Sequence, residues 1–369
     1  MAPNNFSISL NDKPTSAADR GAILKNPGFG VAFTDHMVTM KWTPDAGWHA
    51  GRLEPYHPFQ LNPATAALHY AQAVFEGLKA YRTQENKILL FRPEDNANRM
   101  AKSAERLAIP HLPVEFFVEA IEELVRADHQ WVPSTNGGSL YLRPFIFASE
   151  AALTVRPARE YTFCLIASPV GDYFAGGQKP LKLWVSTDYV RAARGGTGAA
   201  KCPGNYASSL MAQAQSVKNG CDQTVFLDAI EQKWIEELGG MNVCFITKDK
   251  KLITPPISGT ILDGITRKSV LTLAAEQGLR VEEVPYAYEQ WRRDAETGHV
   301  IEAFACGTAA VIVSIGTVRS ADGDFTVGDG SIGPITASLR QRLVNIQLGV
   351  EPDNHGWVRQ VTISSTQQK

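Results

Sequence analysis

One lysine lies in a run of small residues, and these surroundings suit covalent chemistry. Residues 195–206 read Gly-Gly-Thr-Gly-Ala-Ala-Lys-Cys-Pro-Gly-Asn-Tyr, and Lys201 is the only charged residue between positions 195 and 216. A lysine amine shielded from water loses its proton more readily and can form a Schiff base with a carbonyl group. Tyr206 offers a phenol that could hydrogen-bond the same ligand. The alternative is an ordinary glycine-rich turn with an incidental lysine.

A second pattern suits the binding of a phosphate group. The run Leu262-Asp263-Gly264-Ile265-Thr266-Arg267 opens a predicted helix over residues 264–277. The start of a helix presents unpaired N–H groups and the positive end of the helix dipole. Gly264 would permit close approach of a ligand, and the Thr266 hydroxyl could add a hydrogen bond. The alternative is that Asp263 caps the helix and has no further role.

Two further turns could contribute to a binding site. Glu236 and Glu237 lie shortly before a predicted strand at residues 242–247. A carboxylate facing inward there could hold a proton on a heterocycle nitrogen, whereas an acidic turn facing water is the alternative. The turn Cys306-Gly307-Thr308-Ala309 could bind an anion through its N–H groups, or could reflect close packing alone.

Tyr141 and Arg143 alternate on a predicted strand over residues 140–147 and therefore share one of its faces. An arginine in an aromatic and apolar strand needs an anionic partner. That partner is either a carboxylate of the protein or a carboxylate of the substrate.

The elements that must position these residues alternate between helix and strand, which favours an α/β class with α+β elements. Helices are predicted at 64–76, 93–107, 116–127, 206–219, 264–277 and 337–348. Strands are predicted at 30–42, 48–56, 80–81, 88–91, 140–147, 161–168, 181–186, 224–228, 242–247, 252–254, 280–284 and 299–315, with a loop or hairpin at 316–333.

The length of 369 residues predicts two domains. Residues 170–180 are rich in Gly and Pro and are interpreted as an interdomain linker. The expected organisation is therefore a smaller N-terminal α/β domain over residues 1–169 and a larger C-terminal domain over residues 181–369.

The composition excludes several classes of protein. Apolar residues make up 44%, charged residues 20%, and the net charge of -2 gives no electrostatic footprint for nucleic acid or an anionic membrane. No apolar run is long enough to span a membrane, and residues 1–26 resemble no secretory signal. The five cysteines show no metal-binding or disulfide spacing. We therefore expect no bound metal, and we expect a reducing, cytoplasmic location.

Taken in this order and spacing, the patterns resemble the branched-chain amino-acid aminotransferases. These are class IV, fold-type IV enzymes that use pyridoxal 5'-phosphate (PLP). The resemblance covers nearly the whole chain. It rests on Gly28-Phe29-Gly30, Leu68-His69-Tyr70, Phe75-Glu76-Gly77-Leu78-Lys79-Ala80-Tyr81, Asn98-Arg99-Met100, Tyr141-Leu142-Arg143-Pro144, Lys201 through Tyr206, Glu237 through Asn242, Gly264 through Arg267 and Gly307-Thr308-Ala309.

The resemblance implies roles around the cofactor. Lys201 would form the internal aldimine with PLP and then move the α-proton of the substrate. Glu237 would pair with the pyridinium nitrogen so that the ring serves as an electron sink, and Tyr206 would hydrogen-bond the phenolic oxygen. The phosphate would be held by Arg99, the backbone of Ile265 and Thr266, and the Thr308 hydroxyl.

The resemblance also implies a substrate pocket and a homodimer. Arg143 would receive the second carboxylate of glutamate, so that one pocket accepts both leucine-type and glutamate-type substrates. The α-carboxylate would be held by Tyr141 and the N–H groups of Thr308 and Ala309, and the apolar wall would be formed by Phe29, Tyr70, Tyr141 and Tyr206. Tyr70, Leu153 and Val155 would reach toward the partner's site.

The implied reaction is reversible, ping-pong transfer of the amino group of leucine, isoleucine or valine to 2-oxoglutarate. Another class IV activity, such as a D-amino-acid aminotransferase or an aminodeoxychorismate lyase, and a non-enzymatic binding module are the alternatives. The sequence departs from some members in two places. Ala310 and Val313 replace a CxxC pair, which excludes thiol gating there, and Gly240 stands where several relatives have Thr.

Overall fold

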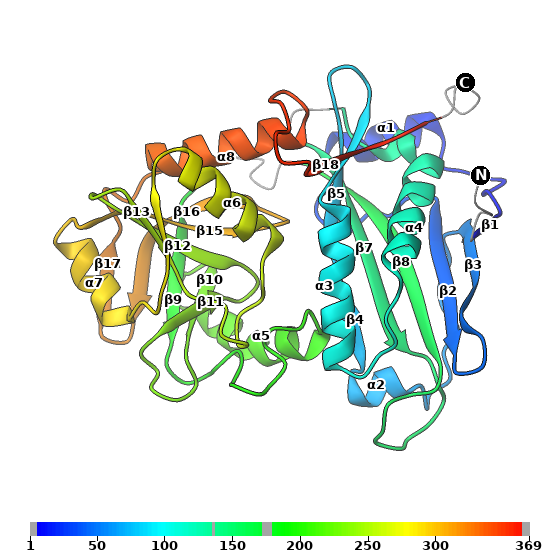
Figure 1. Ribbon diagram of the computed structural model, residues 1–369, viewed down its shortest axis with the longest axis horizontal. Helices are drawn as coiled ribbons and strands as arrows, with labels where there is room; N and C mark the ends of the chain where they lie inside the picture. Colours follow the sequence, from blue (N-terminus) through cyan, green and yellow to red (C-terminus); the bar gives the residue numbers. More distant parts are fainter. Residues whose placement is uncertain (1–5, 135–136, 172–178, 364–369) are drawn as a thin grey trace. The chain divides into compact units, whose positions relative to one another are not determined.

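The computed structural model describes residues 6–134, 137–171 and 179–363, and it divides into two compact units (Figure 1). Unit 1 comprises Met1–Tyr173, Lys201–Pro203 and Ile346–Lys369. Unit 2 comprises Phe174–Ala200 and Gly204–Asn345. Lys201 therefore belongs to unit 1, although the residues on either side of this short segment belong to unit 2.

Unit 1 is built on a nine-stranded sheet whose order is β1-β3-β2-β8-β7-β5-β6-β18, with β4 paired to β7. Its pairings are antiparallel except for β1 with β3. The strands are β1 (Phe6–Ile8), β2 (His36–Thr43), β3 (Gly47–Pro55), β4 (Ala73–Phe75), β5 (Leu78–Arg82), β6 (Ile88–Phe91), β7 (Ser139–Ala148), β8 (Tyr161–Val170) and β18 (Val358–Val361).

Two amphipathic helices of unit 1, α3 (Pro93–Arg106) and α4 (Val114–Ala127), pack against each other and lie over its sheet (Figure 1). Pro93 fixes the first turn of α3, where Glu94 and Asp95 complement the helix dipole. The buried stripe of α4 includes the predicted residues Phe117, Ile121, Leu124 and Val125. The remaining helical segments are α1 (Ala17–Lys25), α2 (Ala66–Tyr70) and a 3-10 turn, η1 (His129–Trp131).

Unit 2 contains a second nine-stranded sheet, of order β11-β10-β9-β16-β15-β12-β13-β14, with β17 paired to β16. This sheet is mixed, because β9 runs parallel to both β10 and β16, and β13 runs parallel to β14. The strands are β9 (Leu181–Ser186), β10 (Gln223–Leu227), β11 (Ile235–Leu238), β12 (Asn242–Thr247), β13 (Lys251–Thr254), β14 (Arg280–Glu283), β15 (Val300–Gly307), β16 (Val311–Ser320) and β17 (Gly323–Thr326).

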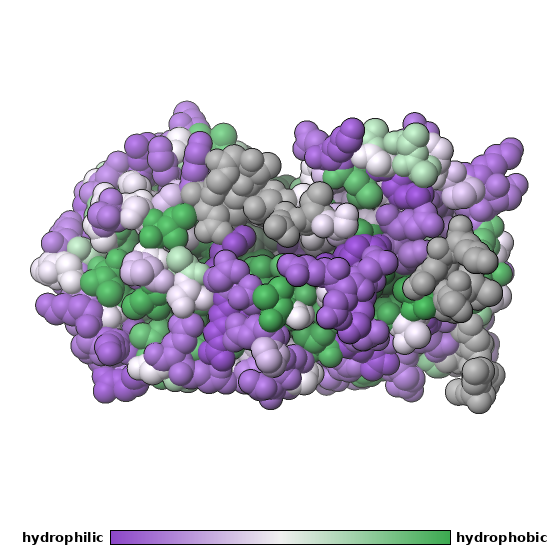
Figure 2. Space-filling view, turned by 90° about the horizontal axis from the view of Figure 1, so that it is seen from above, coloured by the Kyte–Doolittle hydropathy of each residue, from purple (hydrophilic) through white to green (hydrophobic). Residues whose placement is uncertain are grey.

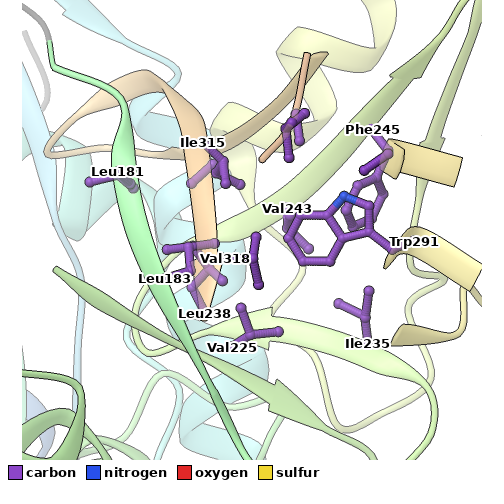
Figure 3. Packing of buried hydrophobic residues seen from close by; sticks show 14 of the residues in the cluster. Leu181, Leu183, Val225, Ile235, Leu238, Val243, Phe245, Trp291, Ile315 and Val318 are labelled. Atoms are coloured by element: carbon purple, nitrogen blue, oxygen red, sulfur yellow. The ribbon is translucent and has the colours of Figure 1, made fainter. Parts of the chain in front are cut away.

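The core of unit 2 is formed by apolar side chains from its strands and from α7 (Tyr288–Glu296) (Figure 3). Trp291 of α7 is fully buried and meets Phe245 edge to face, with ring centroids 4.9 Å apart. The other helices are α5 (Pro203–Lys218), α6 (Ile265–Glu276) and α8 (Pro334–Gln347).

The structure confirms the α/β class and many of the predicted elements, including the strands at 181–186 and 242–247. It corrects others, including the strand predicted at 30–42, which begins only at His36. The predicted helix at 64–76 ends at Tyr70, because Ala71 adopts a left-handed conformation with φ 50° and the following residues pair with β7 as β4. The predicted strand at 299–315 is two strands, β15 and β16, joined by a tight turn.

The predicted domain boundaries at residues 169 and 181 fall beside residues 172–178, which lie outside the described part of the chain. The C-terminal residues differ from the expected division. Strand β18 pairs with β6 of unit 1, and Ile346–Lys369 accordingly belongs to unit 1. A short edge strand of this kind carries little periodic signal in the sequence.

The face drawn in Figure 2 is largely hydrophilic over the described residues, with smaller hydrophobic areas between. Among the described helices, none combines the length and apolar character needed to cross a lipid bilayer.

Candidate active site

Candidate residues occur in both units. In unit 1 the backbone of Lys201 is held on both sides. Its N–H donates to Ser103 Oγ at 2.9 Å, and its carbonyl accepts from the Phe75 N–H at 3.0 Å. Its Nζ lies 4.8 Å from the centroid of the Phe75 ring. The loop before α5 is therefore fixed at the residue that the sequence singles out.

A buried ion pair lies beside this lysine. Arg99 Nε and Nη2 donate to the two carboxylate oxygens of Glu76, at 2.7 and 2.8 Å. Ser103, which holds the Lys201 backbone, follows Arg99 by four residues on α3 and therefore lies on the same helical face. Helix α3 thus positions both the ion pair and the lysine.

These surroundings lower the pKa of Lys201 to about 8. Burial of the amine is the largest cause, because desolvation disfavours the charged ammonium. The positive charges of Arg99 and Arg143 act in the same direction, while Glu76 opposes them. A substantial fraction of the amine is therefore neutral, and nucleophilic, near neutral pH.

Tyr141 and Arg143 share a face of β7, as the alternation predicts. Arg143 Nη2 donates to the Tyr141 hydroxyl at 3.1 Å, and the guanidinium carbon lies 4.9 Å from the centroid of the Phe75 ring. No carboxylate of the described residues pairs with Arg143, and its buried Nε has no hydrogen-bond partner among them. The sequence predicts either a protein carboxylate or a substrate carboxylate as the partner of Arg143. The described residues provide no protein carboxylate, which leaves the carboxylate of a substrate.

Close packing fixes the Tyr141 ring from two sides. A Cβ at Gly77 would lie 2.1 Å from the Tyr141 hydroxyl, so only glycine fits at this position. The Phe29 ring lies 5.3 Å from the Tyr141 ring, centroid to centroid. The motif Phe75-Glu76-Gly77 therefore supplies a ring to Lys201, a carboxylate to Arg99 and space to Tyr141.

In unit 2 both glutamates of the acidic segment are buried, which overturns the interpretation of a turn facing water. They lie within β11, where Leu227 pairs with Ile235 but Val225 pairs with Leu238, so that two residues oppose one. This β-bulge lets Ile235 and Leu238 both enter the apolar core (Figure 3). Glu236 and Glu237 are the bulged residues, and each finds polar partners outside that core.

Glu237 is held by an ion pair and by two hydrogen bonds. Its carboxylate pairs with the buried guanidinium of Arg191 and accepts from the Leu262 N–H at 3.1 Å. Asn242 Nδ2 donates to Glu237 Oε2 at 3.3 Å and to the Leu262 carbonyl at 3.1 Å. Glu237 is therefore tied to the segment that leads into α6.

The start of α6 differs from the capping interpretation. The N-cap is Gly264 and makes no side-chain hydrogen bond, while Asp263 forms an ion pair with Lys268, Oδ2 to Nζ at 2.6 Å. A Cβ at Gly264 would lie 2.0 Å from Asn242 Oδ1, so the position requires glycine. The predicted phosphate residues Ile265 and Thr266 form the buried first turn that follows.

Thr308 and Ala309 lie in the turn between β15 and β16. The turn is tight, since Gly307 pairs with Val311, and Val311 adopts φ 63°, which costs energy for a β-branched residue. A Cβ at Gly307 would lie 3.3 Å from Met241 Cγ. The neighbouring Gly240 has room for a side chain, because a Cβ there would meet Tyr206 Cε1 at 4.0 Å.

Of the residues predicted from the sequence, the structure brings together Lys201, Arg99, Tyr141, Arg143 and Phe29 in unit 1. Tyr70 instead donates its hydroxyl hydrogen to the Leu153 carbonyl, and both residues are exposed, as is Val155. The sequence alone assigns no role to Glu76, Ser103, Arg191 or Asn242. Glu76 and Asn242 were visible within the motifs, whereas Ser103 and Arg191 are defined only by three-dimensional contacts.

Comparisons with known proteins place this geometry in context. Residues 73–318 match the family model "Amino-transferase class IV". A probable branched-chain-amino-acid aminotransferase of Streptomyces coelicolor is 54% identical over 97% of this chain and 99% of its own. A branched-chain-amino-acid aminotransferase of Mycolicibacterium smegmatis is 52% identical, over 96% and 98% of the two chains.

Solved structures share the fold. The PLP form of a branched-chain amino acid aminotransferase from Thermobaculum terrenum superposes with a TM-score of 0.71 at 27% identity. The match covers 88% of this chain and 98% of that one.

Proposed function

Because the chain belongs to the class IV aminotransferase family, we propose that it is a PLP-dependent branched-chain amino-acid aminotransferase. It exchanges the amino group of leucine, isoleucine or valine with 2-oxoglutarate, giving branched 2-oxo acids and glutamate. The observation that carries the proposal is Lys201, whose backbone is held on both sides and whose pKa is lowered to about 8. The relatives that match nearly the full length of the chain support the same activity.

The residues present fit this cofactor. Its aldehyde requires an amine that can lose its proton near neutral pH, and the lowered pKa of Lys201 meets this requirement. Its ring nitrogen requires a fixed carboxylate, and Glu237 is buried and held by Arg191 and Asn242. Its phosphate requires N–H donors without an obstructing side chain, and α6 begins with Gly264, where a Cβ would clash with Asn242.

When bound, PLP supplies an electron-withdrawing ring that makes the substrate's α-proton acidic. Lys201 moves that proton, since its amine can accept and return it near neutral pH. Glu237 would hold a proton on the ring nitrogen. Tyr206 would hydrogen-bond the ring oxygen, and Arg99, the backbone of Ile265 and Thr266, and the Thr308 hydroxyl would hold the phosphate.

The residues proposed to bind substrate fall into three groups, according to the part of the substrate that each would contact. Arg143, which has no carboxylate partner among the described residues, binds the second carboxylate of glutamate or 2-oxoglutarate. Tyr141 and the N–H groups of Thr308 and Ala309 hold the α-carboxylate. Aliphatic side chains lie against Phe29, Tyr70, Tyr141 and Tyr206, so one pocket serves both substrate classes.

An amino-donor profile tests the proposal. The PLP-loaded protein is assayed with L-leucine, L-isoleucine, L-valine and L-glutamate, and with D-alanine as the donor that identifies a D-amino-acid aminotransferase. We expect transfer from all four L-donors and little from D-alanine. Preference for D-alanine would favour the alternative class IV activity, and absence of a visible cofactor band would contradict PLP dependence.

We further propose a homodimer in the cytoplasm. Tyr70, Leu153 and Val155 are 39%, 62% and 83% exposed, and exposed apolar residues of this kind suit a subunit interface. The five cysteines are free and buried, which suits a reducing compartment. Light scattering of the purified protein gives the oligomer mass, and Leu153→Asp is expected to shift it toward the monomer.

A further inference from the structure

A cavity of about 330 Å³ lies in unit 2, outside the residues assigned above to PLP and substrate. It is lined by side chains that include Arg194, Ile230, Trp234 and Glu236, while none of the predicted cofactor or substrate residues contributes to it. Its volume is at the lower end of the range for small-molecule sites. Its lining is mainly apolar but carries both a cationic and an anionic side chain, and this combination defines what it could bind.

Glu236 is the buried polar group of this cavity. It is only 7% exposed, and its Oε1 accepts a hydrogen bond from the Thr260 hydroxyl at 2.5 Å. Its Oε2 is buried and has no hydrogen-bond partner among the described residues. Burial raises the pKa of Glu236. An unsatisfied buried carboxyl oxygen is costly, and an N–H donor from a bound molecule would remove that cost.

Glu236 and Glu237 are neighbours in the bulge of β11, but their carboxylates have different hydrogen-bond partners. Glu237 pairs with Arg191 and with the segment that leads into α6, whereas Glu236 contacts Thr260 and lines the cavity. The two carboxylates therefore contact different groups, although Arg191 links them, because it also donates to the Thr260 carbonyl and its charge acts to lower the pKa of Glu236.

Arg194 supplies the cation of the cavity. It is exposed and makes no ion pair with any described residue. The acidic residue Asp228 also lines the cavity, but its carboxylate accepts four backbone hydrogen bonds, from the N–H groups of Ile230, Glu231, Lys233 and Trp234. Asp228 thus shapes the wall, which leaves Arg194 and Glu236 as the charged groups that can contact a ligand.

The apolar wall is unusually open to solvent. Ile230 is 82% exposed, and it is carried on the loop that Asp228 holds rigid. Trp234, from the same loop, lines the cavity and donates its indole N–H to Glu231, and Lys233 Nζ lies 4.4 Å from the centroid of its ring. A rigid, exposed apolar side chain beside a cavity gains free energy when a ligand covers it.

We propose that this cavity is a second small-molecule site, which binds a compound with an amino group for Glu236, an anionic group for Arg194 and an apolar body against Ile230 and Trp234. Aliphatic α-amino acids combine these three features. The substrate class of the proposed reaction would therefore also bind away from the catalytic residues.

Binding of L-leucine to the pyridoxamine form of the holoenzyme tests this site, because a cofactor that already carries an amino group cannot bond the leucine amine. Formation of the pyridoxamine form is verified first by absorption, so failure of the proposed function is recognised before the binding measurement. Equilibrium dialysis with labelled L-leucine then gives the stoichiometry and Kd. We expect one molecule per chain.

Variants locate the bound leucine. Arg194→Gln and Glu236→Gln each remove one charged partner and should weaken binding about tenfold or more, and Ile230→Asp should weaken it as well. Glu289→Gln, at an exposed position of α7 outside the cavity, is the matched control and should bind as the wild type does. Because Arg194 and Ile230 are exposed, their variants remain informative even if Glu236→Gln folds poorly. No leucine binding, or binding insensitive to Arg194→Gln and Ile230→Asp, would overturn the proposal.

Discussion

The carboxylate of Glu76 accepts two hydrogen bonds from the guanidinium of Arg99, at 2.7 and 2.8 Å, and both side chains are buried. This pair fixes the arginine that we assign to the phosphate. It also sets the charge around Lys201, because Arg99 lowers the pKa of the lysine while Glu76 raises it. One ion pair thus links cofactor binding to the nucleophile.

Replacement of Glu76 by glutamine should be costly for stability. Glu76→Gln keeps the size of the side chain but leaves Arg99 buried without its counter-ion, which typically costs about 3 kcal/mol or more. The change should also lower the pKa of Lys201 further, since the opposing charge is lost. Thermal unfolding of the apoprotein measures the first effect. Unchanged stability would mean that the pair is not buried as described; Glu85→Gln, at an exposed residue, is the control.

The lowered pKa of Lys201 predicts the pH dependence of PLP attachment. Below about pH 8 the amine is mostly protonated, so the rate of imine formation in the apoprotein should rise with pH and level off above 8. Between about pH 8 and 10.5 the unfolded state binds more protons than the folded state, so this lysine makes stability increase with pH across that window. Stopped-flow absorption measures the rate. A midpoint near 10.5, the value of a free lysine, would show that Lys201 is not desolvated.

The bulge in β11 predicts different effects at two adjacent glutamates. Glu237→Gln removes the partner of Arg191 and the charge proposed for the ring nitrogen, so turnover should fall strongly while PLP remains bound. Glu236→Gln changes a side chain that contacts Thr260, so its effect on turnover should be much smaller. Steady-state kinetics of both variants compare them directly. A larger loss of turnover for Glu236→Gln would mean that Glu236, and not Glu237, contacts the cofactor.

The sequence was most informative where local chemistry dictates local structure. The alternation of Tyr141 and Arg143 predicts their shared face, and Pro93 predicts the start of α3. The sequence could not predict the bulge at Glu236 and Glu237, because an inward-facing carboxylate and a solvated acidic turn both remain open until the pairing of β10 with β11 is known.

Partners distant in the chain were beyond sequence reasoning. Ser103 lies 98 residues from Lys201, and no periodicity connects them. Arg191 is separated from Glu237 by helix α5 and strand β10, and only the fold brings their side chains into an ion pair. Such contacts follow from tertiary packing, whereas motif order can identify only the residues that carry chemistry.

Replacement of Arg143 should affect the two substrate classes to different extents. Arg143→Met retains much of the packing of the stem and removes the guanidinium. We expect kcat/KM to fall strongly for glutamate and 2-oxoglutarate, because their second carboxylate loses its partner, and only modestly for leucine and its keto acid.

Each half-reaction is measured separately by cofactor absorption. Arg143 also donates to the Tyr141 hydroxyl, so Tyr141→Phe serves as the comparison for loss of that hydrogen bond. Equal losses of kcat/KM for leucine and glutamate in Arg143→Met would mean that Arg143 has a structural role. The proposal that one pocket accepts both substrate classes would then be wrong.

Chemical trapping tests directly whether Lys201 bonds the cofactor. Borohydride reduction of the PLP-loaded protein converts the lysine–cofactor link into a stable bond, and peptide mass spectrometry then locates the added mass. We predict a single modified peptide containing Lys201, and no modified peptide from Lys201→Ala treated in the same way. Modification of another lysine, such as the buried Lys79, with Lys201 unmodified would show that Lys201 does not bond the cofactor.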